Sequence, residues 1–193
     1  MRWASIRECR PTVREDSPME APLLVVVSGM PASGKTTVAR ALSRRLLLPL
    51  IAKDDIKEQL YDALGPGDIA WSERLGAATY ALIFAVARSI LATGTGAIVE
   101  ANFFRGQESD FELLPECRVV QVHCEAPLVV LVDRYRGRVR HPGHHDDQKV
   151  AELAARFESG AHAPLDLPGN LVRVDTTELV DEQLLVERLR TSL

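Results

Sequence analysis

The 193-residue chain has few cysteines, few aromatic residues and no excess of positive charge. Its cysteines, Cys9, Cys117 and Cys124, form no CxxC pair and no metal-ligand spacing, so neither a disulfide framework nor a zinc site is expected. The formal net charge of -4 argues against a protein that mainly binds a nucleic-acid backbone, because that affinity comes from lysine and arginine. We expect one globular domain in the reducing cytoplasm.

We expect neither a secretory leader nor a full-length membrane span. Residues 1–16 contain no continuous apolar segment. The most apolar stretch, residues 77–92, is shorter than the ~20 residues that a span needs and contains Arg88, so it is interpreted as a buried helix without a membrane partner. Residues 1–22 mix charges with prolines, which predicts a disordered N-terminal extension before a domain of residues 23–193, with Met19 as an alternative start.

Short apolar runs rich in β-branched residues alternate with helical patterns along the domain. Strands are predicted at residues 23–27, 50–52, 97–100, 118–123 and 170–174, and helices at 35–48, from 54, at 72–91, from about 126 and at 178–189. This alternation predicts an α/β fold with a five-stranded parallel sheet and helices on both faces. Ligands are expected at the carboxyl ends of the strands.

A phosphate-binding motif, G-x-x-x-x-G-K-[ST], occupies residues 29–36 between the first predicted strand and the first predicted helix. Its successive backbone N–H groups and the following helix N-terminus are expected to point at the phosphates of ATP. Lys35 should meet the β- and γ-phosphates, Thr36 should bind Mg²⁺ and Thr37 should lie near the α-phosphate. The predicted ATP-binding residues of this segment are Gly29, Ala32, Ser33, Gly34, Lys35, Thr36 and Thr37.

An acidic pair, Asp54 and Asp55, opens the helix after the second predicted strand. An aspartate at this place can cap the helix. It can also orient an acceptor hydroxyl and take its proton during phosphoryl transfer. The segment by itself leaves both roles open for Asp54.

SGMPASGKTT followed by AKDDIKEQL resembles the P-loop kinase superfamily over residues 23–175. Within that superfamily it resembles the AAA-type ATP-binding group related to polynucleotide 5′-kinases, zeta-toxin-type kinases and chloramphenicol phosphotransferase-like kinases. The resemblance implies that Asp54 is the general base and that Lys57 contacts the acceptor. Lys53 and Lys57 stand where the polynucleotide kinases have arginine, and lysine cannot make a bidentate phosphate contact. We therefore expect a hydroxylated metabolite or antibiotic-like acceptor ahead of a nucleic-acid 5′ end.

The third predicted strand ends in Glu100, followed by Asn102. This segment resembles the apolar run with a terminal acid that holds the Mg²⁺ shell in P-loop proteins, so Glu100 is predicted to be a magnesium partner beside Thr36. The alternative is that Glu100 accepts backbone hydrogen bonds. Asn102 and Arg105 are predicted to contact the acceptor, because loops at strand ends commonly carry such contacts, whereas Phe103 and Phe104 form either an aromatic wall or part of the core.

Four arginines, at positions 134, 136, 138 and 140, lie within seven residues at the end of a predicted helix. The segment of about residues 134–147 resembles the arginine-rich lid of nucleoside-monophosphate-type kinases. Arg134 and Arg138, at i and i+4, are predicted to contact ATP and to stabilise the transferring group. A solvated basic helix end is the alternative. We do not expect a metal site in the cluster of His141, His144, His145, Asp146 and Asp147. Histidines that face phosphate or solvent are the simpler interpretation.

These features predict a Mg-ATP-dependent kinase that transfers the γ-phosphoryl group to a hydroxyl of a small molecule. Residues 173–177 stand where related kinases contact adenine, and a strand-to-helix cap is the alternative explanation of the same Asp and Thr residues. The alternatives are a 5′-hydroxyl polynucleotide kinase and a nucleotide-switched ATP-binding regulator.

Overall fold

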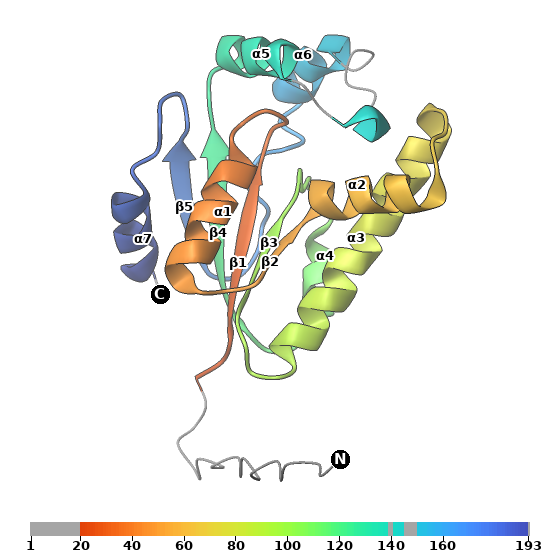
Figure 1. The fold of residues 1–193 in the computed structure, drawn as a ribbon. Helices are drawn as coiled ribbons and strands as arrows, with labels where there is room; N and C mark the ends of the chain where they lie inside the picture. The colour runs from red at the N-terminus through yellow and green to blue at the C-terminus, as the bar shows by residue number, and fades with distance from the viewer. Residues whose placement is uncertain (1–19, 139–140, 145–149, 193) are drawn as a thin grey trace, which may run out of the picture.

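The computed structural model describes residues 20–138, 141–144 and 150–192, in which strands and helices alternate (Figure 1). The elements are β1 (Leu23–Gly29), α1 (Lys35–Leu46), β2 (Leu50–Ala52), α2 (Lys53–Leu64), α3 (Ile69–Leu91), β3 (Ala97–Glu100), α4 (Glu108–Glu112), β4 (Arg118–Glu125), α5 (Leu128–Gly137), the 3₁₀ turn η1 (Pro142–His144), α6 (Val150–Glu158), β5 (Asn170–Asp175) and α7 (Glu182–Arg190).

The strands form one parallel sheet in the order β2-β3-β1-β4-β5. This confirms the predicted α/β fold with a five-stranded parallel sheet. Because β1 lies in the centre, the loop that follows it emerges at the middle of the carboxyl edge. The sequence did not predict α4, which has only five residues, or α6, which follows a polar segment.

Side chains of β1 alternate between two hydrophobic layers. Val25 and Val27 face α1 and α7, and Leu24 and Val26 face α3 on the other side of the sheet. All four are fully buried, as is expected for a central strand covered on both faces. The helices therefore cover both faces of the sheet, and a ligand site can form at the carboxyl ends of its strands.

The long helix α3 (Ile69–Leu91) has the length and composition to cross a membrane, with a mean hydropathy of 1.3 in its most apolar window. In this structure one face of the helix packs in the core, since Ile83, Phe84, Ala87 and Leu91 lie against the sheet with at most 7% exposure. The sequence interpretation of residues 77–92 as a buried helix applies to this face of α3. Its N-terminal half packs against α2 and projects past the carboxyl edge of the sheet (Figure 1).

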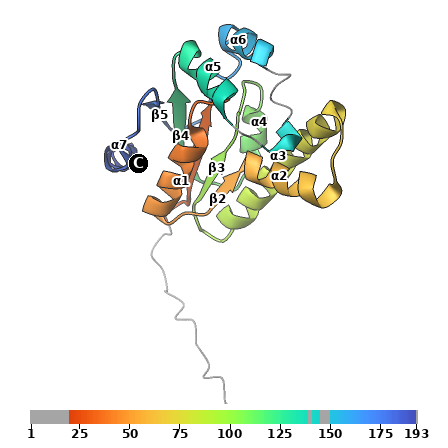
Figure 2. The ribbon, with the colours of Figure 1, turned by 45° about the horizontal axis from the view of Figure 1, so that its top comes forward.

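The helices α5 and α6 lie above the carboxyl edge (Figure 2). They pack through Leu131, Tyr135 and Leu153 onto Met30 of the loop after β1. Of the predicted N-terminal extension, residues 1–22, the first 19 residues lie outside the described residues. Glu20 forms an ion pair with Arg118 at the start of β4, at 3.3 Å.

Candidate active site

The loop between β1 and α1 folds into a phosphate-binding cradle. Gly29 (φ 138°), Ala32 (φ 64°) and Gly34 (φ 76°) have positive φ angles, which allow the chain to curl around one point. A Cβ on Gly29 would lie 2.3 Å from the carbonyl oxygen of Cys124, so only glycine fits there. The helix α1 begins at Lys35, directly after the loop, so its positive N-terminal end faces the loop. No acidic residue in the first turn of α1 offsets that positive charge.

Lys35, Thr36 and Glu100 form a polar group at the base of the cradle. Lys35 Nζ donates to the carbonyl oxygen of Met30 at 2.7 Å, and Thr36 Oγ1 donates to Glu100 Oε2 at 3.3 Å. Burial lowers the pKa of Lys35 and raises the pKa of Glu100, and the attraction between the two charges offsets only part of each shift. An anion beside Lys35 and a cation beside Glu100 would oppose both pKa shifts.

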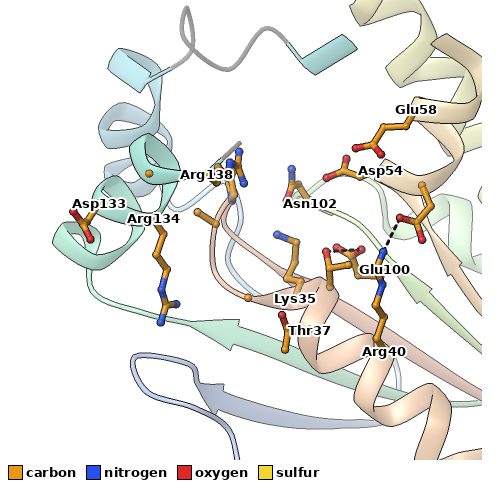
Figure 3. A pocket seen from close by; sticks show the side chains of 16 residues that line it. Lys35, Thr37, Arg40, Asp54, Glu58, Glu100, Asn102, Asp133, Arg134 and Arg138 are labelled. Carbon is orange, nitrogen blue, oxygen red and sulfur yellow. Dashed lines mark hydrogen bonds and ion pairs between the residues drawn. The ribbon is translucent and has the colours of Figure 1, made fainter. Parts of the chain in front are cut away.

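A cavity of about 620 Å³ joins the cradle to α2 and to the end of β3 (Figure 3). Lys35 and Glu100 line it from the P-loop side, and Asp54 and Asn102 line it from the farther side. In Figure 3 the side chains of Asp54 and Asn102 extend into the same space above Lys35. Asp54 lies in the first turn of α2, whereas the N-cap position belongs to Ala52. The predicted base and the predicted metal partners therefore share one cavity.

The two predicted lid arginines face different parts of the site. Arg138 lines the cavity with Lys35 and packs over the ring of Tyr135, 4.1 Å from its centroid. Arg134 points toward β5 and donates to the carbonyl oxygens of Thr176 at 2.7 Å and Thr177 at 3.0 Å. The helix α5 ends at Gly137, and Arg138 has an extended backbone, so the two arginines do not continue on one helical face.

A second cavity, of about 340 Å³, lies beside Arg134 between α1 and the loop after β5. Its wall includes Val38, Leu179 and Val180, which suit the flat faces of a nucleotide base. Both cavities share Gly34, Thr37 and Arg134, so a nucleotide can extend from one into the other. The segment 173–177, which the resemblance associated with adenine, reaches this cavity through Thr176.

Two residues expected at the acceptor, Lys57 and Arg105, do not line the first cavity. Lys57 is 5% exposed and its Nζ donates to Ser72 Oγ of α3 at 2.8 Å. Arg105 lies exposed on the loop after β3. Phe103 is fully buried in the core beneath α3, whereas Phe104 is 42% exposed.

Three further charged residues that the sequence motifs did not predict line the cavity: Arg40, Glu58 and Asp133. Arg40 forms an ion pair with Asp55 at 3.1 Å, and Glu58 extends into the cavity from α2. Helical spacing could have found two of them, because Arg40 lies four residues after Thr36 and Glu58 four residues after Asp54.

Two histidines of the lid segment, His141 and His144, contact carboxylates of α2. His141 Nε2 lies 2.9 Å from Asp62 Oδ1, and His144 Nε2 lies 2.9 Å from Glu58 Oε1. Within the ranges 20–138, 141–144 and 150–192, no group of three or more His, Cys, Asp or Glu residues is arranged to hold a metal ion. The remaining members of the disfavoured cluster, and one lid arginine, lie outside these ranges: His145, Asp146, Asp147 and Arg140.

A strand, glycine-rich loop and helix at the centre of a parallel sheet define a P-loop nucleotide-binding protein. Residues 24–159 match the family of the AAA domain, which is more than half of the chain. The chain belongs to this family, and it has the fold of P-loop kinases. None of the curated proteins is significantly similar to it.

Three solved structures are similar to this chain to different degrees. An inferred kinase from Chloroflexus aurantiacus J-10-fl is 38% identical, with a TM-score of 0.84 over 90% of this chain and 100% of that one. A sugar kinase from Janibacter sp. HTCC2649 is 18% identical, with a TM-score of 0.57 over 89% of this chain and 94% of that one. A shikimate kinase from Bacteroides thetaiotaomicron is 17% identical, with a TM-score of 0.52 over 88% and 97%. The last two share the fold alone.

Proposed function

We propose that the protein is a Mg-ATP-dependent kinase that transfers the γ-phosphoryl group of ATP to a hydroxyl of a small molecule. The proposal rests on one observation above all: Asp54 lines the same cavity as the P-loop residues Lys35 and Thr36. A P-loop by itself supports nucleotide binding. A carboxylate across the phosphate site adds the group that phosphoryl transfer to a hydroxyl requires.

In this proposal Asp54 accepts the proton of the acceptor hydroxyl while the hydroxyl oxygen forms a bond to the γ-phosphorus. The bond between that phosphorus and the β,γ-bridging oxygen breaks, and ADP leaves. Lys35 and Arg138 neutralise the charge that develops on the phosphoryl oxygens. Arg134 holds the base side of the nucleotide, and Asn102 orients the acceptor beside Asp54.

The residues of the cradle fit a magnesium ion bound together with a nucleotide. Thr36 and Glu100 offer oxygen ligands, which Mg²⁺ prefers, and few protein ligands are needed when phosphates supply the others. The hydroxyl of Ser33 is buried and has no hydrogen-bond partner among the described residues, and a phosphate oxygen would supply one. When bound, the ion would neutralise phosphate charge and help to align the γ-phosphoryl group.

The charges near Asp54 favour a small acceptor over a nucleic-acid strand. Asp54, Asp55 and Glu58 line the acceptor side of the cavity, where Arg40 is already paired with Asp55. A polynucleotide needs cationic side chains along its backbone, and carboxylates repel it. We also propose a cytoplasmic location, where ATP is available and where the free thiols of Cys117 and Cys124 remain reduced.

Incubation of the purified protein with γ-labelled ATP, Mg²⁺ and a panel of hydroxylated small molecules tests this proposal. A 5′-hydroxyl oligonucleotide belongs in the same panel. The proposal expects label on a small molecule. Label on the oligonucleotide would instead support a polynucleotide kinase, and ATP turnover that no acceptor changes would support a nucleotide-switched regulator.

A further inference from the structure

A buried hydrogen-bond chain connects α2, α3 and η1. Lys57 Nζ of α2 donates to Ser72 Oγ of α3 at 2.8 Å, and Ser72 Oγ donates to the carbonyl oxygen of Gly143 in η1 at 2.7 Å. Ser72 has no exposed surface, and Lys57 is 5% exposed. We call this chain of Lys57, Ser72 and Gly143 the serine bridge. The two ends of the bridge are 86 residues apart in the sequence.

Three further contacts hold residues 141–144, which comprise His141 and η1, on α2 around the serine bridge. His144 contacts Glu58, and His141 contacts Asp62, each at 2.9 Å. The ring of Tyr61 stacks edge-on against His141, with centroids 5.2 Å apart. A Cβ on Gly143 would lie 2.8 Å from the Tyr61 ring, so glycine is what allows η1 to approach α2 this closely. A segment held by so many contacts is docked on α2 rather than lying on it loosely.

The serine bridge joins the two walls of the proposed active site. The helix α2 carries Asp54 in its first turn, and Glu58, one turn later, lines the cavity and contacts η1. The chain that enters η1 comes from the end of α5, where Arg138 lines the opposite wall. Docking of η1 on α2 therefore limits how far Arg138 and Asp54 can move apart.

We propose that Ser72 and Lys57 are positioning residues for phosphoryl transfer. They dock η1 on α2 and so set the width of the cavity in which the γ-phosphoryl group and the acceptor meet. This inference rests on the proposed kinase function. It goes beyond that function because it gives a role to Ser72 and Lys57, which do not line the cavity. It also assigns Lys57 to the serine bridge instead of to the acceptor. Without the bridge, water enters more readily and transfer to the acceptor competes less well with hydrolysis.

The test uses two variants that weaken the docking by different means. Ser72→Ala removes the shared hydroxyl, and Gly143→Ala pushes η1 off Tyr61 while leaving the hydrogen bond between Lys57 and Ser72 in place. Ser89→Ala is the matched control, because its hydroxyl contacts only its own helix, at the other end of α3. Melting temperatures identify any variant that loses its fold, and Gly143→Ala, which leaves the side chains of Lys57 and Ser72 unchanged, keeps the test decisive if Ser72→Ala unfolds.

Two measurements are made on each variant. Hydrogen exchange of the backbone amides of Gly143 and His144 reports docking and requires no acceptor. We expect exchange to become about tenfold faster, as for the loss of one hydrogen bond. The ratio of ATP hydrolysed to product phosphorylated should rise about tenfold, while KM for ATP stays within about twofold, because the P-loop and Arg134 are unchanged.

The outcomes show separately whether the positioning role or the kinase proposal fails. Faster exchange with an unchanged ratio would overturn the positioning role and leave a purely structural bridge. Unchanged exchange in both variants would overturn the docking itself. If the wild-type protein phosphorylates no acceptor, the kinase proposal fails, and the positioning role fails with it, even where faster exchange shows that the docking exists.

Discussion

His123 makes the stability of this protein depend on pH in a way that can be worked out from its surroundings. It lies near the carboxyl end of β4, is 5% exposed, and shares a 2.9 Å hydrogen bond between Nδ1 and Ser28 Oγ. Burial, followed by the charges of Arg173 and Lys35, lowers the pKa of His123 from 6.5 to about 4. The folded protein therefore keeps this imidazole neutral at a pH where the unfolded chain binds a proton.

The sign and size of the effect follow from this difference. Below about pH 6.5 the unfolded state binds more protons than the folded state. The contribution of His123 to the free energy of unfolding is therefore complete above that pH and is lost as the pH falls toward 4. With these two pKa values, the loss between about pH 7.5 and pH 5 is about 2 kcal/mol. Burial also lowers the pKa of His162, which adds an effect of the same sign.

Urea denaturation followed by circular dichroism, at about pH 7.5 and about pH 5, measures this loss. The His123→Gln variant keeps a polar side chain near Ser28 but cannot titrate. The free energy of unfolding of the wild type should fall by about 2 kcal/mol more than that of the variant over this interval. If both proteins lose the same amount, His123 is not the group responsible and the reasoning is refuted.

Three further substitutions have distinct expected effects. Gly29→Ala should weaken ATP binding, measured by calorimetry, by about tenfold or more, because the new Cβ meets the carbonyl oxygen of Cys124 at 2.3 Å; unchanged affinity would contradict the cradle geometry. Glu100→Gln should keep the fold but raise the Mg²⁺ concentration for half-maximal activity by about tenfold, and an unchanged Mg²⁺ titration would remove Glu100 from the metal site. Arg134→Ala should mainly raise KM for ATP, whereas Arg138→Ala should lower kcat by about 100-fold; steady-state kinetics that show the reverse would exchange their roles.

Local sequence patterns predicted the sheet and the cradle because both are made by contiguous residues. The apolar run 23–27 is a buried strand, and the motif that follows it carries its own glycines and lysine. The position of Asp54 also followed from local order, because the carboxyl ends of parallel strands share one edge.

Long-range packing explains what the sequence did not show. Lys57 is close to Asp54 along α2, but it turns toward Ser72 on α3, and no spacing rule contains that contact. Arg134 and Arg138 have helical spacing, yet α5 ends between them, so that both line the first cavity but only Arg134 also reaches the second cavity and the carbonyl oxygen of Thr176. The first helix likewise ends at Leu46 instead of Leu48, because Leu47 adopts a left-handed conformation (φ 55°) ahead of Pro49.

The transfer rate of the Asp54→Asn variant tests the kinase proposal most directly. Asp55→Asn is the matched control, because it removes the neighbouring carboxylate, which is paired with Arg40. With the acceptor identified by γ-phosphate labelling, Asp54→Asn should lower kcat by about 100- to 10,000-fold while ATP affinity stays within about threefold, and Asp55→Asn should lose less than about tenfold. Full transfer by the Asp54→Asn variant would contradict the account, since the carboxylate across the phosphate cradle would then have no part in the chemistry.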